Sequence, residues 1–239
     1  MQAILSKYSD KDFGTIVFKR SNRARRMNIK VFAERLEIIL PYGFSEMDGM
    51  QFLNSIREKL RKQQTKVSQK SNSILITEEK PLQTLTFVVH VKKVERKDVF
   101  SSLKSGVLTI EYPDFLEEKD SKTQLYFWNS INYFLRKEAK RILPYRTYEL
   151  AKKYGFIFSD VKIQSSKTRW GSCNQKKIIN FSFYLLLLPQ HLIDYVILHE
   201  LCHTKEMNHS PKFWEWMDKV TDGKAENMRN ELKKYAIPQ

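Results

Sequence analysis

The first half of the chain consists mainly of short runs that mix apolar and polar residues over strand lengths, as half-buried β-strands do. These runs cover 14–21, 25–32, 35–41, 73–77, 85–94 and 106–113. Between the third and fourth runs, residues 45–67 place Phe52, Ile56 and Leu60 four positions apart, which is the spacing of one helix face. The pattern predicts a small mixed α+β module at the N-terminus.

The second half changes to longer helical patterns around one hairpin. Apolar residues recur at helical spacing over 125–155, where Gly155 provides a C-terminal stop and Pro144 is expected to kink the helix or divide it in two. A strand is expected over 156–164, and residues 167–189 contain two strand-like runs joined at "NQKK", the pattern of a hairpin. Further helices are expected from Pro189 onward, over 210–220 and over 224–236.

A polar, charged segment at 114–124 follows a strand-ending proline and separates the two patterns, so it is the expected linker. The predicted division is an N-terminal α+β module over residues 1–116 and a second domain over residues 121–239. The fold class expected for the chain is therefore α+β.

The motif "HELCH" at 199–203 carries the clearest chemical signal. Because a helix advances by about 100° per residue, His199 and His203 project from one face about one turn apart and can bind a single Zn²⁺. Glu200 can then reach a water on the ion without binding the ion itself. This combination is typical of metal-dependent hydrolases.

A third histidine, His209, follows His203 after an interval in which the helix can end and the chain can turn back toward the metal. Three protein ligands leave one position open for water, which is typical of a catalytic zinc site. We therefore expect one zinc ion per chain, held by the three histidines, with Glu200 as general base. The alternatives are a helix with two hydrogen-bonded histidines and an unrelated His209, or Cys202 as a fourth ligand.

The histidine spacing also matches the metzincin pattern HExxHxxGxxH, with one departure. Glu206 stands where metzincins have a glycine that permits a sharp turn. Another device must make the turn here, so metzincin membership is not expected.

The composition of the chain indicates which partners and which cellular location to expect. The chain has 239 residues and a net charge of +15, and such a field favours acidic partners, including nucleotides, nucleic acid and acidic peptides. No apolar run approaches the ~20 residues that cross a bilayer, and the N-terminus becomes charged too early for a secretion signal. The two cysteines, Cys173 and Cys202, form no CxxC pair. We expect a cytoplasmic protein without membrane contact.

Several segments resemble the YgjP-like metal-dependent hydrolases in order and spacing. They are "RWGSC" at 169–173, "NFSFYLLLLP" at 180–189, "YVILHELCH" at 195–203 and "NHSPKFW" at 208–214, with "RSNRARRMNIKV" at 20–31 similar to that family's N-terminal region. Proteins of this family have a zincin fold and are related to the SprT and WLM metallopeptidases. The resemblance implies a zincin-like C-terminal metallohydrolase domain, with His199, His203 and His209 as zinc ligands and Glu200 as general base.

The resemblance also implies how a peptide substrate would bind. In zincin folds the strand that faces the active-site helix receives an extended substrate by edge pairing, and the hairpin at 167–183 would supply that strand. Arg169 and Trp170 are then candidate substrate-binding residues. The alternatives are a structural ion pair for Arg169 and core packing for Trp170.

The leading hypothesis is a zinc metallopeptidase acting on a peptide or protein substrate. One alternative is a nucleoside triphosphate pyrophosphatase, since some members of the family are described as nucleotide pyrophosphatases. Against it, the chain has no phosphate-binding glycine loop and no carboxylate cluster for Mg²⁺. A second alternative is a nucleic-acid-associated protein with an SprT-like protease activity or an auxiliary zinc site, which salt-dependent DNA binding would favour.

Overall fold

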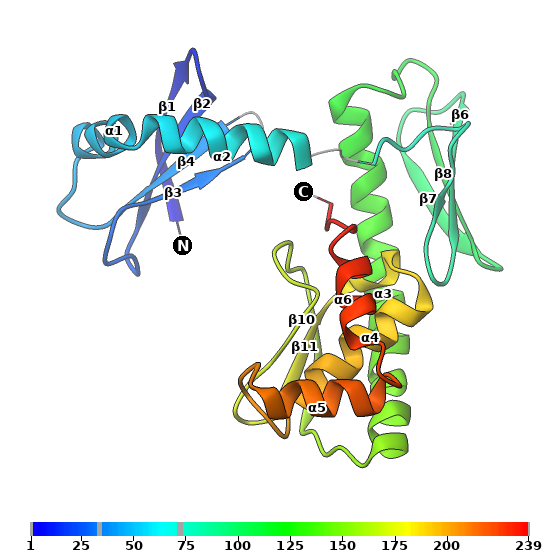
Figure 1. Ribbon diagram of the computed structural model, residues 1–239. Coiled ribbons are helices and arrows are strands. Elements are labelled where there is room, and N and C mark those ends of the chain that lie inside the picture. The colour runs from blue at the N-terminus through cyan, green and yellow to red at the C-terminus, as the bar shows by residue number, and fades with distance from the viewer. Residues whose placement is uncertain (1, 33–34, 71–73, 239) are drawn as a thin grey trace. The chain divides into compact units, whose positions relative to one another are not determined.

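The computed structural model of the chain describes residues 2–32, 35–70 and 74–238. The chain divides into two compact units, residues 1–73 and residues 74–239. Both units combine helices and sheets (Figure 1), so the predicted α+β class is confirmed. Each unit has a hydrophobic core of its own.

The N-terminal unit is a mixed sheet with helices on one face (Figure 1). Its strands are β1 (Gln2–Asp10), β2 (Gly14–Ser21), β3 (Asn28–Val31) and β4 (Arg35–Leu40), in the order β1-β2-β4-β3. β2 and β4 are parallel, and the other pairs are antiparallel. The strands predicted at 14–21, 25–32 and 35–41 are confirmed, whereas β1 was not predicted.

The segment predicted as one helix at 45–67 forms two helices, α1 (Glu46–Ser55) and α2 (Arg57–Lys70). A capping box begins α1: the Ser45 side chain accepts from the Asp48 N–H, and the Asp48 carboxylate accepts from the Ser45 N–H. The helices separate at Ile56, whose φ of −122° lies outside the helical range. Leu53 and Leu60, on either side of the break, both pack in the core, so the break keeps both helices on the sheet.

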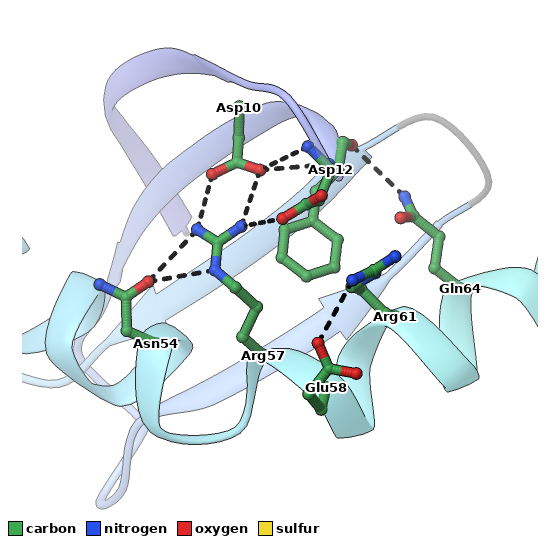
Figure 2. Close-up of polar contacts among 8 residues, drawn as sticks. Asp10, Asp12, Asn54, Arg57, Glu58, Arg61 and Gln64 are labelled. Carbon is green, nitrogen blue, oxygen red and sulfur yellow. Dashed lines mark hydrogen bonds and ion pairs between the residues drawn. The ribbon is translucent and has the colours of Figure 1, made fainter.

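Arg57 ties the start of α2 to the turn between β1 and β2 (Figure 2). Its Nη2 lies 2.8 Å from Oδ2 of Asp10, and its Nη1 lies 2.5 Å from Oδ2 of Asp12. Oδ1 of Asn54 accepts from Nε at 3.3 Å, and the guanidinium carbon lies 5.1 Å from the ring centroid of Phe13. The hydrogen bond from Arg57 is the main reason that the pKa of Asp10 lies below its ordinary value.

The C-terminal unit is built along α3 (Ser121–Tyr154), the longest helix in the described parts of the chain. One sheet packs against it, with β5 (Leu82–Gln83), β6 (Val88–Val94), β7 (Phe100–Lys104) and β8 (Val107–Pro113) in the order β5-β6-β8-β7. Val89 and Ile110 of this sheet share a hydrophobic cluster with Phe127 and Ile131 of α3.

The boundary between the two compact units lies at a different position from the linker expected at 114–124. Residues 114–124 connect β8 to α3 inside the C-terminal unit, and the boundary between the compact units lies at 73/74. The sheet at 82–113 belongs with α3 because their apolar residues form one core, which the polar character of 114–124 does not report. Of the strand predicted at 73–77, residue 73 lies outside the described residues and residues 74–77 have no regular structure.

Pro144 does not divide α3, which continues to Tyr154. The buried stripe of Ala139, Leu143 and Thr147 packs on both sides of the proline, and this packing offsets the lost hydrogen bond. The helix ends at Gly155, whose φ of 71° is the left-handed conformation expected of a glycine stop.

A second sheet and three helices complete this unit within the described residues (Figure 1). The strands are β9 (Asp160–Gln164), β10 (Gly171–Cys173) and β11 (Ile178–Ser182), followed by the 3₁₀ turn η1 (Phe183–Leu187), α4 (Gln190–Cys202), α5 (Pro211–Val220) and α6 (Ala225–Leu232). β10 and β11 form the predicted antiparallel hairpin, and β9 pairs with β11 in parallel. A helix bearing HExxH beside this sheet, packed on α3, is the expected zincin-like arrangement. None of the described helices has the length and apolar character needed to span a membrane.

Candidate metal centre

α4 holds the HELCH motif in a fixed position because most of the helix is buried. Leu192, Ile193, Val196 and Ile197 anchor it in the core that it shares with α3. Arg146 of α3 adds a two-point contact to α4: its Nε and Nη2 lie 2.8 and 2.7 Å from the two carboxylate oxygens of Asp194. Apolar packing and this ion pair together orient the residues that follow on α4.

The structure brings together the three histidines predicted from the sequence. His199 lies in the last turn of α4, His203 caps the helix, and His209 lies in the loop that follows. One ring nitrogen of each lies within 4.8 Å of the others, and Nε2 of His209 is 3.1 Å from Nε2 of His199. Burial, with smaller effects from the two other histidines, lowers the pKa of His199 to about 3, so its imidazole stays neutral. Three imidazoles at this separation are a donor set that fits a divalent metal ion.

The turn between His203 and His209 does not need a glycine at residue 206. The chain continues past α4 in tight turns, with the Glu206 N–H donating to the Cys202 carbonyl at 3.0 Å. The Glu206 carbonyl in turn lies 3.0 Å from Nδ1 of His203. A carbonyl can only accept, so Nδ1 carries the proton and Nε2 keeps the lone pair for a ligand. Cys202 itself is fully buried and is not part of the histidine group.

All three imidazoles pack against the ring of Phe213, which lies in the first turn of α5. Its ring stacks on His203 with centroids 4.6 Å apart and meets His199 and His209 edge-on at 4.9 and 4.8 Å. The side chain is fully buried, and the Ser210 cap that begins α5 fixes its place. The contacts with Phe213 restrict the rotation of the imidazole rings, which favours a preformed ligand geometry.

Glu200 lies against the backbone of β10. A Cβ atom on residue 171 would be 2.7 Å from Oε1 and 2.8 Å from Cγ of Glu200, so the carboxyl group occupies the space that Gly171 leaves free. The backbone N–H of Cys173 donates to this carboxyl group. Burial raises the pKa of Glu200 to about 8, while nearby Arg169 and the Cys173 N–H act in the opposite direction.

A pocket of about 250 Å³ opens beside Glu200 and His199. The two residues predicted to bind substrate, Arg169 and Trp170, both line it. Arg169 is exposed and has no ion-pair partner among the residues that the structure describes, so the structural ion pair considered as its alternative is not present there. Trp170 is half-buried and also packs against the core. Their role toward a substrate stays a prediction.

The sequence did not single out three features of this site. They are Gly171, Phe213 and Arg229. For Phe213 a signal exists, because the Ser-Pro pair at 210–211 begins a helix and places the ring in its first turn, next to the His209 loop. Arg229 has no comparable signal, since it reaches the pocket from α6, 60 positions after Arg169.

Comparison with known proteins identifies a family. The model of the YgjP-like metallopeptidase domain matches residues 25–235. The chain belongs to the YgjP-like family. This membership confirms the resemblance in the sequence, and it supports a metal-dependent peptidase whose ligands would come from the histidine group.

Two solved structures also match the chain. They are the metallopeptidase zymogens abylysin of Pyrococcus abyssi and jannalysin of Methanocaldococcus jannaschii, 24% and 21% identical. Each match covers 37% of this chain, with 90% of abylysin and 91% of jannalysin, and has a TM-score of 0.34. No curated protein matches the sequence significantly.

Proposed function

We propose that this YgjP-like protein is a zinc-dependent peptidase in which His199, His203 and His209 hold one zinc ion and Glu200 is the general base. The observation that carries the proposal is the convergence of three imidazoles, whose ligand atoms lie within 4.8 Å of one another, beside the buried carboxyl group of Glu200 on α4. Three histidine ligands without a thiolate are typical of catalytic zinc sites, which keep one position open.

Different residues of the chain have different proposed roles in the reaction. When bound, a zinc ion supplies a Lewis acid that activates water and polarises the scissile carbonyl. Glu200 takes the proton from the attacking water and transfers it to the leaving amine. Gly171 and the Cys173 N–H hold the Glu200 carboxyl group, while Phe213 holds the imidazoles.

The edge of β10 is the proposed binding line for an extended peptide. β10 lies at the end of the strand order β10-β11-β9, so one side of it is not paired within the sheet. Gly171 of this strand lies against Glu200, which supports the proposal because a peptide added at the edge would then lie next to the general base. Arg169 and Trp170, which immediately precede β10, would contact that peptide.

The decisive experiment compares zinc-loaded wild type with Glu200→Gln on an unfolded protein and on nucleoside triphosphates. We expect the wild type to cleave the protein and the variant to lose at least about 100-fold in rate with an equal zinc content. Glu215→Gln, which changes an exposed acid on α5, is the matched control and should keep full activity. A zinc-replete Glu200→Gln that still cleaves the protein would refute the role of Glu200. Consumption of triphosphates alone would favour the pyrophosphatase alternative.

The identity of the metal is tested separately. Chelation should abolish activity, and elemental analysis should find one zinc per active chain, with loss of bound zinc in His209→Ala. Restoration by another divalent ion but not by zinc would contradict the assignment of zinc while leaving the histidine site in place.

A further inference from the structure

Two arginines face the pocket beside Glu200 from opposite parts of the sequence. Arg169 precedes β10 and Arg229 lies on α6, and both line the pocket of about 250 Å³. Neither has an acidic partner within ion-pair distance among the described residues. Glu231, the acid nearest to Arg229 in the sequence, is 2.9 Å from Nε2 of His191. Both guanidinium groups therefore lack an ion-pair partner among the described residues, and the acidic group that lines the pocket with them is the buried Glu200.

Arg229 is held in place by an aromatic side chain. Its guanidinium carbon lies 5.0 Å from the ring centroid of Trp214, and Trp214 stacks on His209 with centroids 6.1 Å apart. The stacking restricts the Arg229 side chain, so less conformational entropy is lost when it binds an anion. Arg229 is thus linked through one ring to a histidine of the metal centre.

The remaining walls of the pocket are largely apolar. Trp170, Tyr195, Val196 and Leu232 line it, and Tyr195 and Val196 are buried. Apolar walls with a few convergent polar groups are typical of a site that takes up part of a ligand. The combination of apolar walls and two arginines fits a short side chain or chain end that carries a negative charge.

We propose that this pocket binds a carboxylate of the substrate, carried by the residue next to the scissile bond, with Arg229 as the main specificity-determining residue and Arg169 beside it. The proposal rests on the proposed peptidase function. The planar fork of a guanidinium matches the two oxygens of a carboxylate. In a peptide, that group is an acidic side chain or the C-terminal carboxylate. Its place next to the scissile bond follows because the pocket shares Glu200 and His199 with the metal centre.

The first test measures kcat/KM on quenched fluorescent peptides. Glu and Gln are exchanged at each position beside the cleavage site, and each peptide is made with a free and with an amidated C-terminus. We expect at least about tenfold faster cleavage of the peptide that carries the recognised carboxylate. Loss of rate in the Glu-to-Gln exchange assigns a side chain, and loss on amidation assigns the chain end. Equal rates for all peptides would overturn the proposal.

Variants then test the arginine. Arg229→Met should remove the preference for the carboxylate, so that the Glu and Gln peptides are cleaved at equal rates, and Arg229→Lys should restore part of the preference. Arg229→Glu should shift the preference toward a Lys peptide. Lys212→Met, which removes one charge from an exposed position on α5, is the matched control. A preference that survives in Arg229→Met would exclude this residue.

A binding measurement separates this proposal from the proposed function. Zinc-loaded Glu200→Gln is titrated with the Glu and Gln peptides while tryptophan fluorescence is followed, since Trp170 and Trp214 lie at or beside the pocket. Tighter binding of the Glu peptide, weakened by salt and absent in the double variant with Arg229→Met, supports the pocket even if no peptide is cleaved. Cleavage without any such difference in binding would retain the peptidase and reject the pocket.

Discussion

Carboxylates that are withdrawn from solvent have different surroundings in the two units. In the N-terminal unit, Asp10 and Asp12 both form ion pairs with Arg57 (Figure 2). The buried Glu37 in the same unit contacts Lys19 at 2.8 Å and Arg35 at 3.3 Å. In the C-terminal unit, Glu200 is 5% exposed and has no cation within ion-pair distance among the described residues.

This difference distinguishes carboxylates with a structural role from a carboxyl group with a proposed catalytic role. A carboxylate with a cationic partner is stabilised in its charged form and resists protonation, which suits a residue that only holds two elements together. Glu200 keeps a raised pKa because the effect of its burial outweighs the opposite effects of nearby Arg169 and the Cys173 N–H. On this basis, a substitution in one unit should leave the other unit unchanged.

The largest effect is expected from Gly171→Ala. The added methyl group would lie 2.7 Å from Oε1 of Glu200, so the carboxyl group must move away from β10. Displacement of a general base by about 1 Å typically costs on the order of 100-fold in rate. Steady-state kinetics and zinc analysis should show low activity with full zinc content. Ser172→Ala on the same strand is the control and should stay active.

A smaller effect, confined to the other unit, is expected from Arg57→Met. The variant leaves Asp10 and Asp12 without their cation, and Asp10 is only 11% exposed. The free energy of opening the N-terminal unit should fall by about 1–2 kcal/mol. Hydrogen exchange of the full-length protein, followed by mass spectrometry of peptides from residues 2–32 and 35–70, measures this directly. Unchanged exchange there would show that the contact is not structural.

The pH dependence of the N-terminal unit follows from the same pair. The hydrogen bond from Arg57 lowers the pKa of Asp10 from 3.8, so the folded state binds this proton more weakly than the unfolded state. The stabilisation is complete above about pH 5 and is lost as pH falls through the lowered pKa. Hydrogen-exchange protection of the N-terminal unit, corrected for intrinsic rates, should fall below about pH 4. Arg57→Met should remove most of that slope, and an equal slope in both proteins would contradict the assignment to Asp10.

The smallest effect is expected from Glu58→Gln. Glu58 pairs with Arg61 on the surface of α2 at 3.3 Å, and its side chain is 76% exposed. Exposed pairs of this kind contribute little, because solvent screens the charges. The thermal midpoint and the exchange rates should equal those of the wild type, which makes this variant the control for Arg57→Met.

Helices and strands could be predicted from the sequence where one regular pattern of apolar residues runs through the whole segment. β2, α3 and α4 follow their predicted ranges closely, because each has a regular apolar face and a recognisable start or stop. β1 was missed because Ile4, Leu5 and Tyr8 are all largely exposed, so the strand shows no buried face and exists through its pairing with β2. The break at Ile56 was missed because the helical spacing of Phe52, Ile56 and Leu60 continues across it.

The sequence alone determined the spacing that places His199, Glu200 and His203 on one helix, and it indicated His209 as their third partner. Helix geometry fixes such relations locally, so they follow from the order of residues. Only the tertiary structure decided that Gly171 makes room for Glu200 and that Arg229 faces the same pocket as Arg169. Contacts between segments far apart in sequence depend on how the whole core packs, which no local pattern encodes.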